Sequence, residues 1–312
     1  MFGVFSASLG MLIALALAIV VTYFYLKDIT QKKHAILRNF PLIGRLRYFF
    51  EQLGEYFRQY FFLGDRDERP FNRSTRSWVY RMAKNEGGVL GFGSTYNLRE
   101  PGALIFVNAP FPVLESDRLP TPPLMIGEGW CNNPFFTRSL VNISGMSFGA
   151  ISQPAVSALS RGAAKAGCWI DTGEGGLSPY HLEGGCDVVM QIGTAKYGVR
   201  DHEGRLSKEK LREIAAHETV RAFEIKLSQG AKPGKGGVLP GGKVTDEIAR
   251  IRGIPPGMDS LSPNRHLDIA NIDELLDMIA RVRDITGKPV GIKTAIGGWD
   301  FMNKLTEAVV RR

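Results

Sequence analysis

The sequence predicts an α/β domain built on a parallel β-sheet and preceded by a membrane-spanning helix. Strand and helix patterns alternate from about residue 140 onward in the chain of 312 residues, as they do in parallel sheets. Residues 1–26 contain no charged side chain. The composition, 44% hydrophobic and 22% charged, is that of a globular protein. It excludes a disordered, collagen-like or coiled-coil chain.

Residues 1–26 are predicted to form a transmembrane anchor. Their core, LGMLIALALAIVVTYFYL, is long enough to span a bilayer and ends in aromatic residues that suit the interface. A cleaved signal peptide is the alternative, but the start has no basic residue and TYFYLKD offers no small-residue cleavage site. A buried core helix is less favoured, because no other segment is this apolar. The positive-inside rule places the main domain in the cytoplasm, because basic residues follow directly: Lys27, Lys32, Lys33, Arg38, Arg45 and Arg47.

Residues 27–139 are predicted to form a basic amphipathic helix and a loop-rich lead-in. Residues 27–84 hold 13 Lys and Arg against 6 Asp and Glu, so most of the net charge of +8 lies there. Within 35–62, apolar residues recur at helical spacing. They are Leu46, Phe49, Phe50, Leu53, Tyr56, Phe57 and Tyr60. Such a helix packs on the following domain or lies on anionic lipid, and next to an anchor both can hold at once. Nucleic-acid binding is disfavoured, because no recognised binding module accompanies the charge.

From residue 140 the elements follow in order. Strands are expected at 140–144, 168–171, 187–192, 223–228 and 289–295. A helix over 155–167 ends at Gly167, and a second runs from Ser207 to about Ala222. Asn271 and Glu274 form a capping box for a third helix, which ends at Gly287. Polar residues end four of the strands and are therefore candidates for chemistry: Ser144, Asp171, Gln229 and Lys293.

Other motifs are weak. Residues 237–243 match the start of a P-loop, but Val244 stands where the magnesium-binding Ser or Thr belongs. Pro233 and Pro240 also make this region a long irregular loop. The three cysteines fit neither a disulfide scaffold nor a metal motif, which favours a reducing compartment. His266 stands alone in SPNRHLD, where a capping or packed histidine is more common than a catalytic one.

Several long motifs together resemble the FMN-binding synthase domain of glutamate synthase, and most closely its stand-alone, membrane-anchored branch. The matching stretches are NISGMSFGAIS (142–152), DTGEGG (171–176), QIGTAKYGV (191–199), EIKLSQGAKPGKGGVLPGGKVTDEIARIRG (224–253), SPNRHLDIANIDEL (262–275) and GIKT (291–294). The lead-in stretches RNFPLIGRLRYFFE (38–51) and PFNRSTRSWVYRMAK (70–84) match that branch too. The resemblance implies a (β/α)₈ TIM-type barrel within residues 140–312, with FMN at the carboxyl ends of its strands.

The resemblance also implies a reaction and a site. Reduced FMN would pass hydride to the imine formed from 2-oxoglutarate and ammonia, giving glutamate. The implied FMN-binding residues are Met146, Ser147, Gly149, Gln191 and Lys293. The implied substrate-binding residues are Glu174, Lys232 and Arg252, and Lys293 and Glu174 are the implied catalytic pair. A cation at Lys293 would stabilise negative charge on a reduced flavin, and two further cations suit a dicarboxylate.

Two departures from the family pattern limit this reading. Val238 replaces a glutamine of the family's substrate site, so the substrate can be a 2-oxo acid other than 2-oxoglutarate. The chain ends about 170 residues after its first predicted strand, whereas a whole barrel needs about 250. We therefore expect an incomplete barrel that is inactive alone, with any iron–sulfur cluster confined to a longer chain. Ammonia and an electron donor would come from elsewhere. The alternatives are a non-catalytic remnant and a flavin oxidoreductase acting on another 2-oxo or 2-hydroxy acid.

Overall fold

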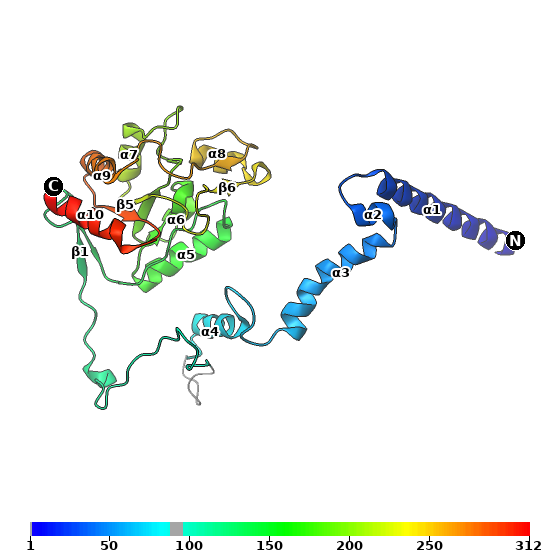
Figure 1. Ribbon diagram of the computed structural model, residues 1–312, viewed down its shortest axis with the longest axis horizontal. Helices are drawn as coiled ribbons and strands as arrows, with labels where there is room; N and C mark the ends of the chain where they lie inside the picture. The colour runs from blue at the N-terminus through cyan, green and yellow to red at the C-terminus, as the bar shows by residue number, and fades with distance from the viewer. Residues whose placement is uncertain (1, 88–95) are drawn as a thin grey trace. The chain divides into compact units, whose positions relative to one another are not determined.

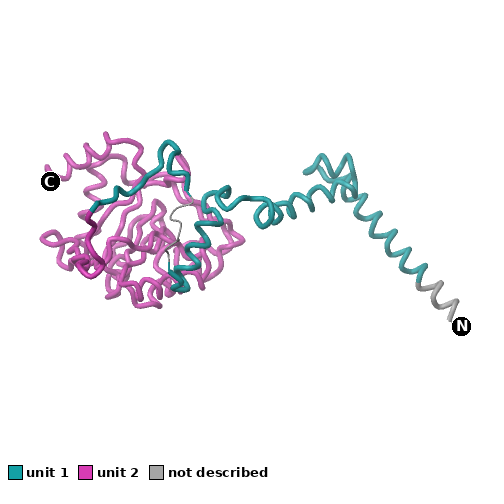
Figure 2. Tube along the Cα trace, turned by 90° about the horizontal axis from the view of Figure 1, so that it is seen from below, with its two compact units in different colours: residues 1–110 teal, residues 111–312 magenta. Residues whose placement is uncertain are grey.

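The computed structural model describes residues 2–87 and 96–312, with side chains from residue 10 onward. The chain divides into two compact units, Met1–Pro110 and Phe111–Arg312, which are coloured separately in Figure 2.

The first unit is helical. It contains α1 (Phe2–Thr30), α2 (Ala35–Asn39), α3 (Gly44–Phe57), a π-helical turn (Arg58–Phe62) and α4 (Arg73–Ala83). Within α1, Gly10–Thr30 is long and apolar enough to cross a membrane, with a mean hydropathy of 2.0, although a signal sequence would pass the same test. The predicted amphipathic segment is helical from Gly44 to Phe62 and leaves large aromatic side chains exposed, among them Phe49, Phe50 and Tyr60.

A buried acidic side chain ties α1 to α3. Asp28 is 1% exposed, and its Oδ2 accepts hydrogen bonds from the backbone N–H of Leu42 and from Nε of Arg45, both at 3.0 Å. The guanidinium of Arg45 also lies over the ring of Phe24. These contacts fix the turn between the apolar helix and the amphipathic one.

The second unit is built on a parallel sheet (Figure 1). Four strands pair in the order β3 (Ile170–Asp171), β4 (Val188–Ile192), β5 (Val220–Lys226) and β8 (Val290–Lys293). The helices α5 (Gln153–Ala166), α7 (Lys208–Ala215), α9 (Ile272–Thr286) and α10 (Trp299–Arg311) bury apolar side chains against one face of this sheet. The antiparallel hairpin of β1 (Leu124–Ile126) and β2 (Phe135–Thr137) packs on the other face, where Phe135 meets Val189 and Ala222. An α/β unit with a parallel sheet is thus confirmed.

The remaining elements surround the carboxyl ends of the strands. They are the 3₁₀ turn Gly173–Gly175, α6 (Pro179–Leu182), β6 (Val238–Leu239), the 3₁₀ turn Gly241–Lys243, α8 (Asp246–Arg252) and β7 (Ser260–Leu261). A 3₁₀ turn at Glu115–Asp117 lies ahead of β1. Over the residues that the structure describes, the four parallel strands do not close into a barrel.

Two predicted elements differ from the structure. The segment 140–144 is not a strand: only Ile143 bridges Ile170, because the side chain of Asn142 takes the backbone N–H of Trp169 at 3.1 Å. The helix from Ser207 ends at Ala215 rather than near Ala222. There, Nζ of Lys288 donates to the carbonyls of Ala215 and His217, and the chain turns directly into β5.

Candidate active site

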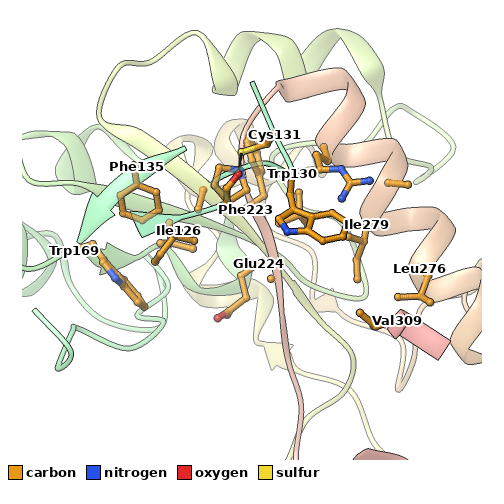
Figure 3. A pocket seen from close by; sticks show the side chains of 18 of the residues that line it. Ile126, Trp130, Cys131, Phe135, Trp169, Phe223, Glu224, Leu276, Ile279 and Val309 are labelled. Carbon is orange, nitrogen blue, oxygen red and sulfur yellow. Dashed lines mark hydrogen bonds between the residues drawn. The ribbon is translucent and has the colours of Figure 1, made fainter. Parts of the chain in front are cut away.

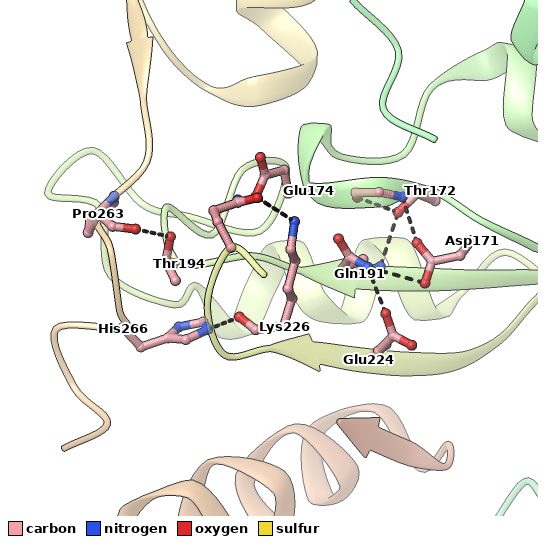
Figure 4. A network of polar contacts seen from close by, with 11 residues as sticks. Asp171, Thr172, Glu174, Gln191, Thr194, Glu224, Lys226, Pro263 and His266 are labelled. Carbon is pink, nitrogen blue, oxygen red and sulfur yellow. Dashed lines mark hydrogen bonds and ion pairs between the residues drawn. The ribbon is translucent and has the colours of Figure 1, made fainter. Parts of the chain in front are cut away.

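One face of the sheet carries a row of polar side chains toward the carboxyl ends of its strands (Figure 4). Successive residues of a strand point to opposite faces. The apolar residues that face the core therefore alternate with residues that face the other side of the sheet, and these include a polar set: Asp171 on β3, Gln191 on β4, Glu224 and Lys226 on β5, and Lys293 on β8. The register pairs Gln191 with Glu224, and Lys226 with Lys293. The sheet thereby places two acids, an amide and two cations side by side.

The acids form a buried network around the amide. Nε2 of Gln191 donates to Oε1 of Glu224 at 2.6 Å and to Oδ2 of Asp171 at 3.4 Å. Oδ1 of Asp171 accepts the backbone N–H of Gly173 at 2.6 Å. Asp171 is 1% exposed, and burial, reinforced by the neighbouring charge of Glu224, raises its pKa to about 8. Burial and the neighbouring charge of Glu224 therefore favour the protonated form of this carboxyl.

Glu174 sits on the turn Gly173–Gly175 and faces the two strands. Its Oε2 accepts from Nε2 of Gln229 at 2.5 Å and pairs with Nζ of Lys226 at 3.4 Å. Two glycines leave it room: a Cβ on Gly193 would lie 2.7 Å from the Cβ of Glu174, and one on Gly237 would lie 2.6 Å from its Oε1. The Glu174 carboxylate is therefore held by the amide of Gln229 and the ammonium of Lys226, and the two neighbouring glycines leave room for it.

Residues 145–149 form a turn that carries the predicted flavin contacts, and this flavin turn lies beside the turn Gly173–Gly175. Ser147 packs so closely on Gly173 that a Cβ there would lie 2.5 Å from its Oγ. The carbonyl of Met146 accepts a hydrogen bond from Nε2 of His181 at 3.0 Å. Burial lowers the pKa of His181, which favours the neutral ring. Its Nδ1 accepts the backbone N–H of Ser178, so the proton of the neutral ring is on Nε2. The turn ends at Gly149, whose φ of +96° favours glycine.

The two cations predicted to bind substrate lie in different surroundings. Arg252 is 4% exposed at the end of α8, where Nη1 donates to Oγ of Ser260 at 3.0 Å and Nη2 to the carbonyl of Phe148 at 3.4 Å. Its guanidinium also lies 5.2 Å from the ring centre of Tyr197. Within the described residues it has no carboxylate partner, and burial lowers its pKa. Lys232 is exposed on the loop after β5, with no side-chain contact to Arg252 among those residues.

Lys293 is half-buried at the end of β8; its carbonyl accepts the backbone N–H of Leu227 at 3.0 Å, while its side-chain ammonium forms no hydrogen bond or ion pair with any residue that the structure describes. Glu224 and Lys226 were not predicted from the sequence, although the alternating segment VRAFEIK contained the signal. Phe223 and Ile225 alternate with Glu224 and Lys226, and this alternation places both charged side chains on one face. Gln191, Glu174 and the end of the strand that carries Lys293 therefore lie on the same side of the sheet. Lys232 is apart from them, on an exposed loop.

A separate cavity of about 530 Å³ lies between the hairpin, β5, β8 and the helices α9 and α10 (Figure 3). Its walls are mostly apolar, with Trp130, Phe135, Trp169 and Phe223 among them. Glu224 reaches it from the polar row. None of the site residues predicted from the sequence lines the cavity, which shares only Glu224 with the polar row.

Comparison with known proteins gives the family. The family model for the conserved region in glutamate synthase matches residues 112–303, which include every residue of the site. The chain belongs to the glutamate synthase family. Its similarity to the glutamate synthase large subunit-like protein YerD of Bacillus subtilis is 38% identity, over 91% of this chain and 61% of YerD.

Other members of the glutamate synthase family match a shorter stretch. An archaeal-type glutamate synthase [NADPH] of Thermotoga maritima is 40% identical over 50% of this chain and 28% of its own length. A glutamate synthase large subunit-like protein of Rhizobium meliloti is 34% identical over 56% of this chain and 37% of its own length. The chain thus spans about three fifths of YerD and between a quarter and two fifths of these two relatives.

Proposed function

We propose that this chain carries the FMN- and substrate-binding half of a glutamate-synthase-like oxidoreductase of TIM-barrel type. Its reaction is the reductive amination of a 2-oxo acid, 2-oxoglutarate or a related one, by ammonia. One observation carries the proposal: Gln191 and Lys293 lie on one face of a parallel sheet toward the carboxyl ends of its strands, where (β/α)₈ enzymes hold their active sites. Glu174 is paired there with Lys226, the register partner of Lys293. Residues 1–26 would form the anchor, 27–139 the lead-in and 140–312 the partial barrel.

The residues at this edge fit a flavin ring. The side-chain oxygen of Gln191 accepts no hydrogen bond from the described residues, and the Lys293 ammonium has no partner among them. A Cβ on Gly145 would lie 2.9 Å from Oδ1 of Asp171, so only the bare backbone of the flavin turn fits here. Met146, Ser147 and Gly149 complete the proposed FMN contacts. Bound FMN would supply the hydride that reduces the imine carbon.

The chain's own groups would bind and orient the substrate. The Glu174 carboxylate, fixed by Gln229 and Lys226, can accept a hydrogen bond from an imine or ammonium nitrogen. Arg252 and Lys232 would supply positive charge for the substrate carboxylates, Lys232 by movement of its exposed loop. Val238 is 56% exposed and offers no hydrogen bond, which leaves room for a 2-oxo acid with a different side chain.

Binding of FMN tests this function. The purified complete gene product is expected to show flavin absorption bands, or to acquire them on titration with FMN, at one flavin per chain. The control is Arg250→Ala, which removes an exposed cation from α8 and should leave the bands unchanged. A complete product that binds no FMN at micromolar concentration would favour the non-catalytic remnant. Flavin binding with turnover of 2-hydroxy acids alone would favour the third alternative.

Membrane attachment is the second part of the proposal. The apolar helix α1, its basic flank and the exposed aromatic side chains of α3 support a single span with the second unit in the cytoplasm, and anionic lipid under the amphipathic helix. We expect the protein to sediment with membranes and to resist extraction by high salt or carbonate. A reporter fused after Arg312 should be active only in the cytoplasm. Recovery in the soluble fraction would contradict the anchor. The reaction would also need an electron donor, and an iron–sulfur cluster is proposed only for a longer chain.

A further inference from the structure

Two carboxyl groups compete for one amide beneath the proposed flavin site. Gln191 has two amide hydrogens, and both are directed at acids, one toward Glu224 and one toward Asp171. Two ionised carboxylates this close in a buried setting repel each other strongly, and a proton held between them removes that repulsion. Glu224 is itself a hydrogen-bond partner of Asp171.

Other groups around the pair do not neutralise it. From the turn after β3, Asp171 receives only the backbone N–H of Gly173. From β8, Lys293 lowers the pKa of Asp171, but this effect is smaller than those of burial and of Glu224, which raise it. On β5, Lys226 is engaged by Glu174 and Gln229. No other charged side chain of the described residues is a main influence on Asp171.

We propose that Asp171 and Glu224 share one proton, and that this pair positions Gln191 with its amide oxygen turned away from the acids and toward the flavin. The proposal rests on the proposed function for the identity of that ligand. The physical reason is the number of hydrogen-bond donors. The NH₂ group of Gln191 donates to both acids, whereas an amide turned the other way would place its oxygen against them and lose both hydrogen bonds. Asp171 and Glu224 are thus positioning residues, and Gln191 is the group that touches the flavin.

The shared proton has a consequence for stability that needs no flavin. Because burial and Glu224 raise the pKa of Asp171 from 3.8 to about 8, folding takes up a proton between these two pH values. The contribution of this group to stability therefore falls as pH rises through that window. It is constant below the window, where both folded and unfolded states are protonated.

Thermal or urea unfolding of the complete chain in detergent, from pH 5 to pH 9, tests the shared proton. At pH 6, wild type should take up about one more proton on folding than Asp171→Asn, judged from the slope of stability against pH. In Glu224→Gln the upper end of the window should move to lower pH, because the neighbouring charge is gone. The control Asp187→Asn removes a half-exposed acid at the start of β4 and should match wild type. An unchanged slope in Asp171→Asn would overturn the proposal. If that variant does not fold, an unshifted window in Glu224→Gln would do so.

The flavin supplies a second, independent readout. Above pH 8 the pair gains a negative charge beside the ring, so the reduction potential of bound FMN should fall with pH more steeply in wild type than in Asp171→Asn. Equal steepness would overturn the positioning role while leaving the proposed function standing. Failure of wild type to bind FMN would overturn the proposed function, and the unfolding experiment would still decide whether the proton is shared.

Discussion

Replacing Arg252 with alanine is expected to lower the free energy of unfolding of the second unit by about 2–4 kcal/mol. The guanidinium joins three separate segments: the flavin turn through the carbonyl of Phe148, β7 through Ser260, and the ring of Tyr197. Removing it leaves the buried carbonyl of Phe148 and the hydroxyl of Ser260 without this partner, and each unsatisfied group costs at most about 1–3 kcal/mol. The substitution also opens a cavity under the flavin turn.

Urea unfolding followed by fluorescence measures this effect. Arg250→Ala is the matched control, because Arg250 lies on the same helix, α8, but is exposed, and it should change stability by no more than about 0.5 kcal/mol. Arg252→Lys should be intermediate, since a lysine keeps the charge but cannot reach all three partners. A loss below about 1 kcal/mol in Arg252→Ala would show that these contacts do not support the turn.

The same variants separate a structural role from a substrate role. A substrate carboxylate bound by the guanidinium would add about 1.5–3 kcal/mol to the binding free energy of the 2-oxo acid. Arg252→Lys would lose part of this contribution, while its flavin content would stay nearly constant. If Arg252→Lys binds both FMN and the 2-oxo acid as wild type does, the residue acts only through the fold. The buried position of Arg252 favours a large structural share.

The sequence was sufficient where the signal is local. Glycines stop α5 and α9 at the predicted residues, Gly167 and Gly287, because each adopts a positive φ that closes the last turn. Asn271 caps α9 by accepting the backbone N–H of Glu274, as the spacing predicts. The segment 140–144 failed for a non-local reason: whether its backbone pairs depends on Asn142 meeting Trp169, twenty-seven residues later.

The candidate site shows the same division. Gln191 and Glu174 follow from motifs. For Glu224 the sequence offers only the alternation of apolar and charged residues in β5, and the register then places it against Gln191. Arg252 is a charged residue at a helix end, which a sequence alone would place on the surface, and its burial comes from packing under the flavin turn. Lys232 matches a motif, yet its position depends on a loop rather than on the sheet, so its role stays a prediction.

Replacing Lys293 with methionine is expected to lower kcat by about 10²–10³ and to lower the reduction potential of bound FMN. Lys293 ends an edge strand of the described sheet, faces the same side as Gln191 and has no acidic partner among the described residues. Its charge is therefore available to a ligand, whereas the charge of its register partner Lys226 is paired with Glu174. A cation in this position stabilises the reduced, anionic flavin more than the oxidised, neutral one.

Reduction of the complete gene product with a dye of known potential measures this effect. A hundredfold selective loss of affinity for the two-electron-reduced flavin corresponds to a fall of about 60 mV, while oxidised FMN should bind within a few-fold of wild type. Lys293→Arg keeps the charge and should recover most of the potential. Lys208→Met removes an exposed lysine at the start of α7 and should leave it unchanged. Equal weakening of oxidised and reduced FMN in Lys293→Met would mean that the side chain shapes the pocket rather than stabilising charge. A methionine, which fills nearly the same volume, would then be tolerated far better than alanine, and that comparison separates the two roles of Lys293.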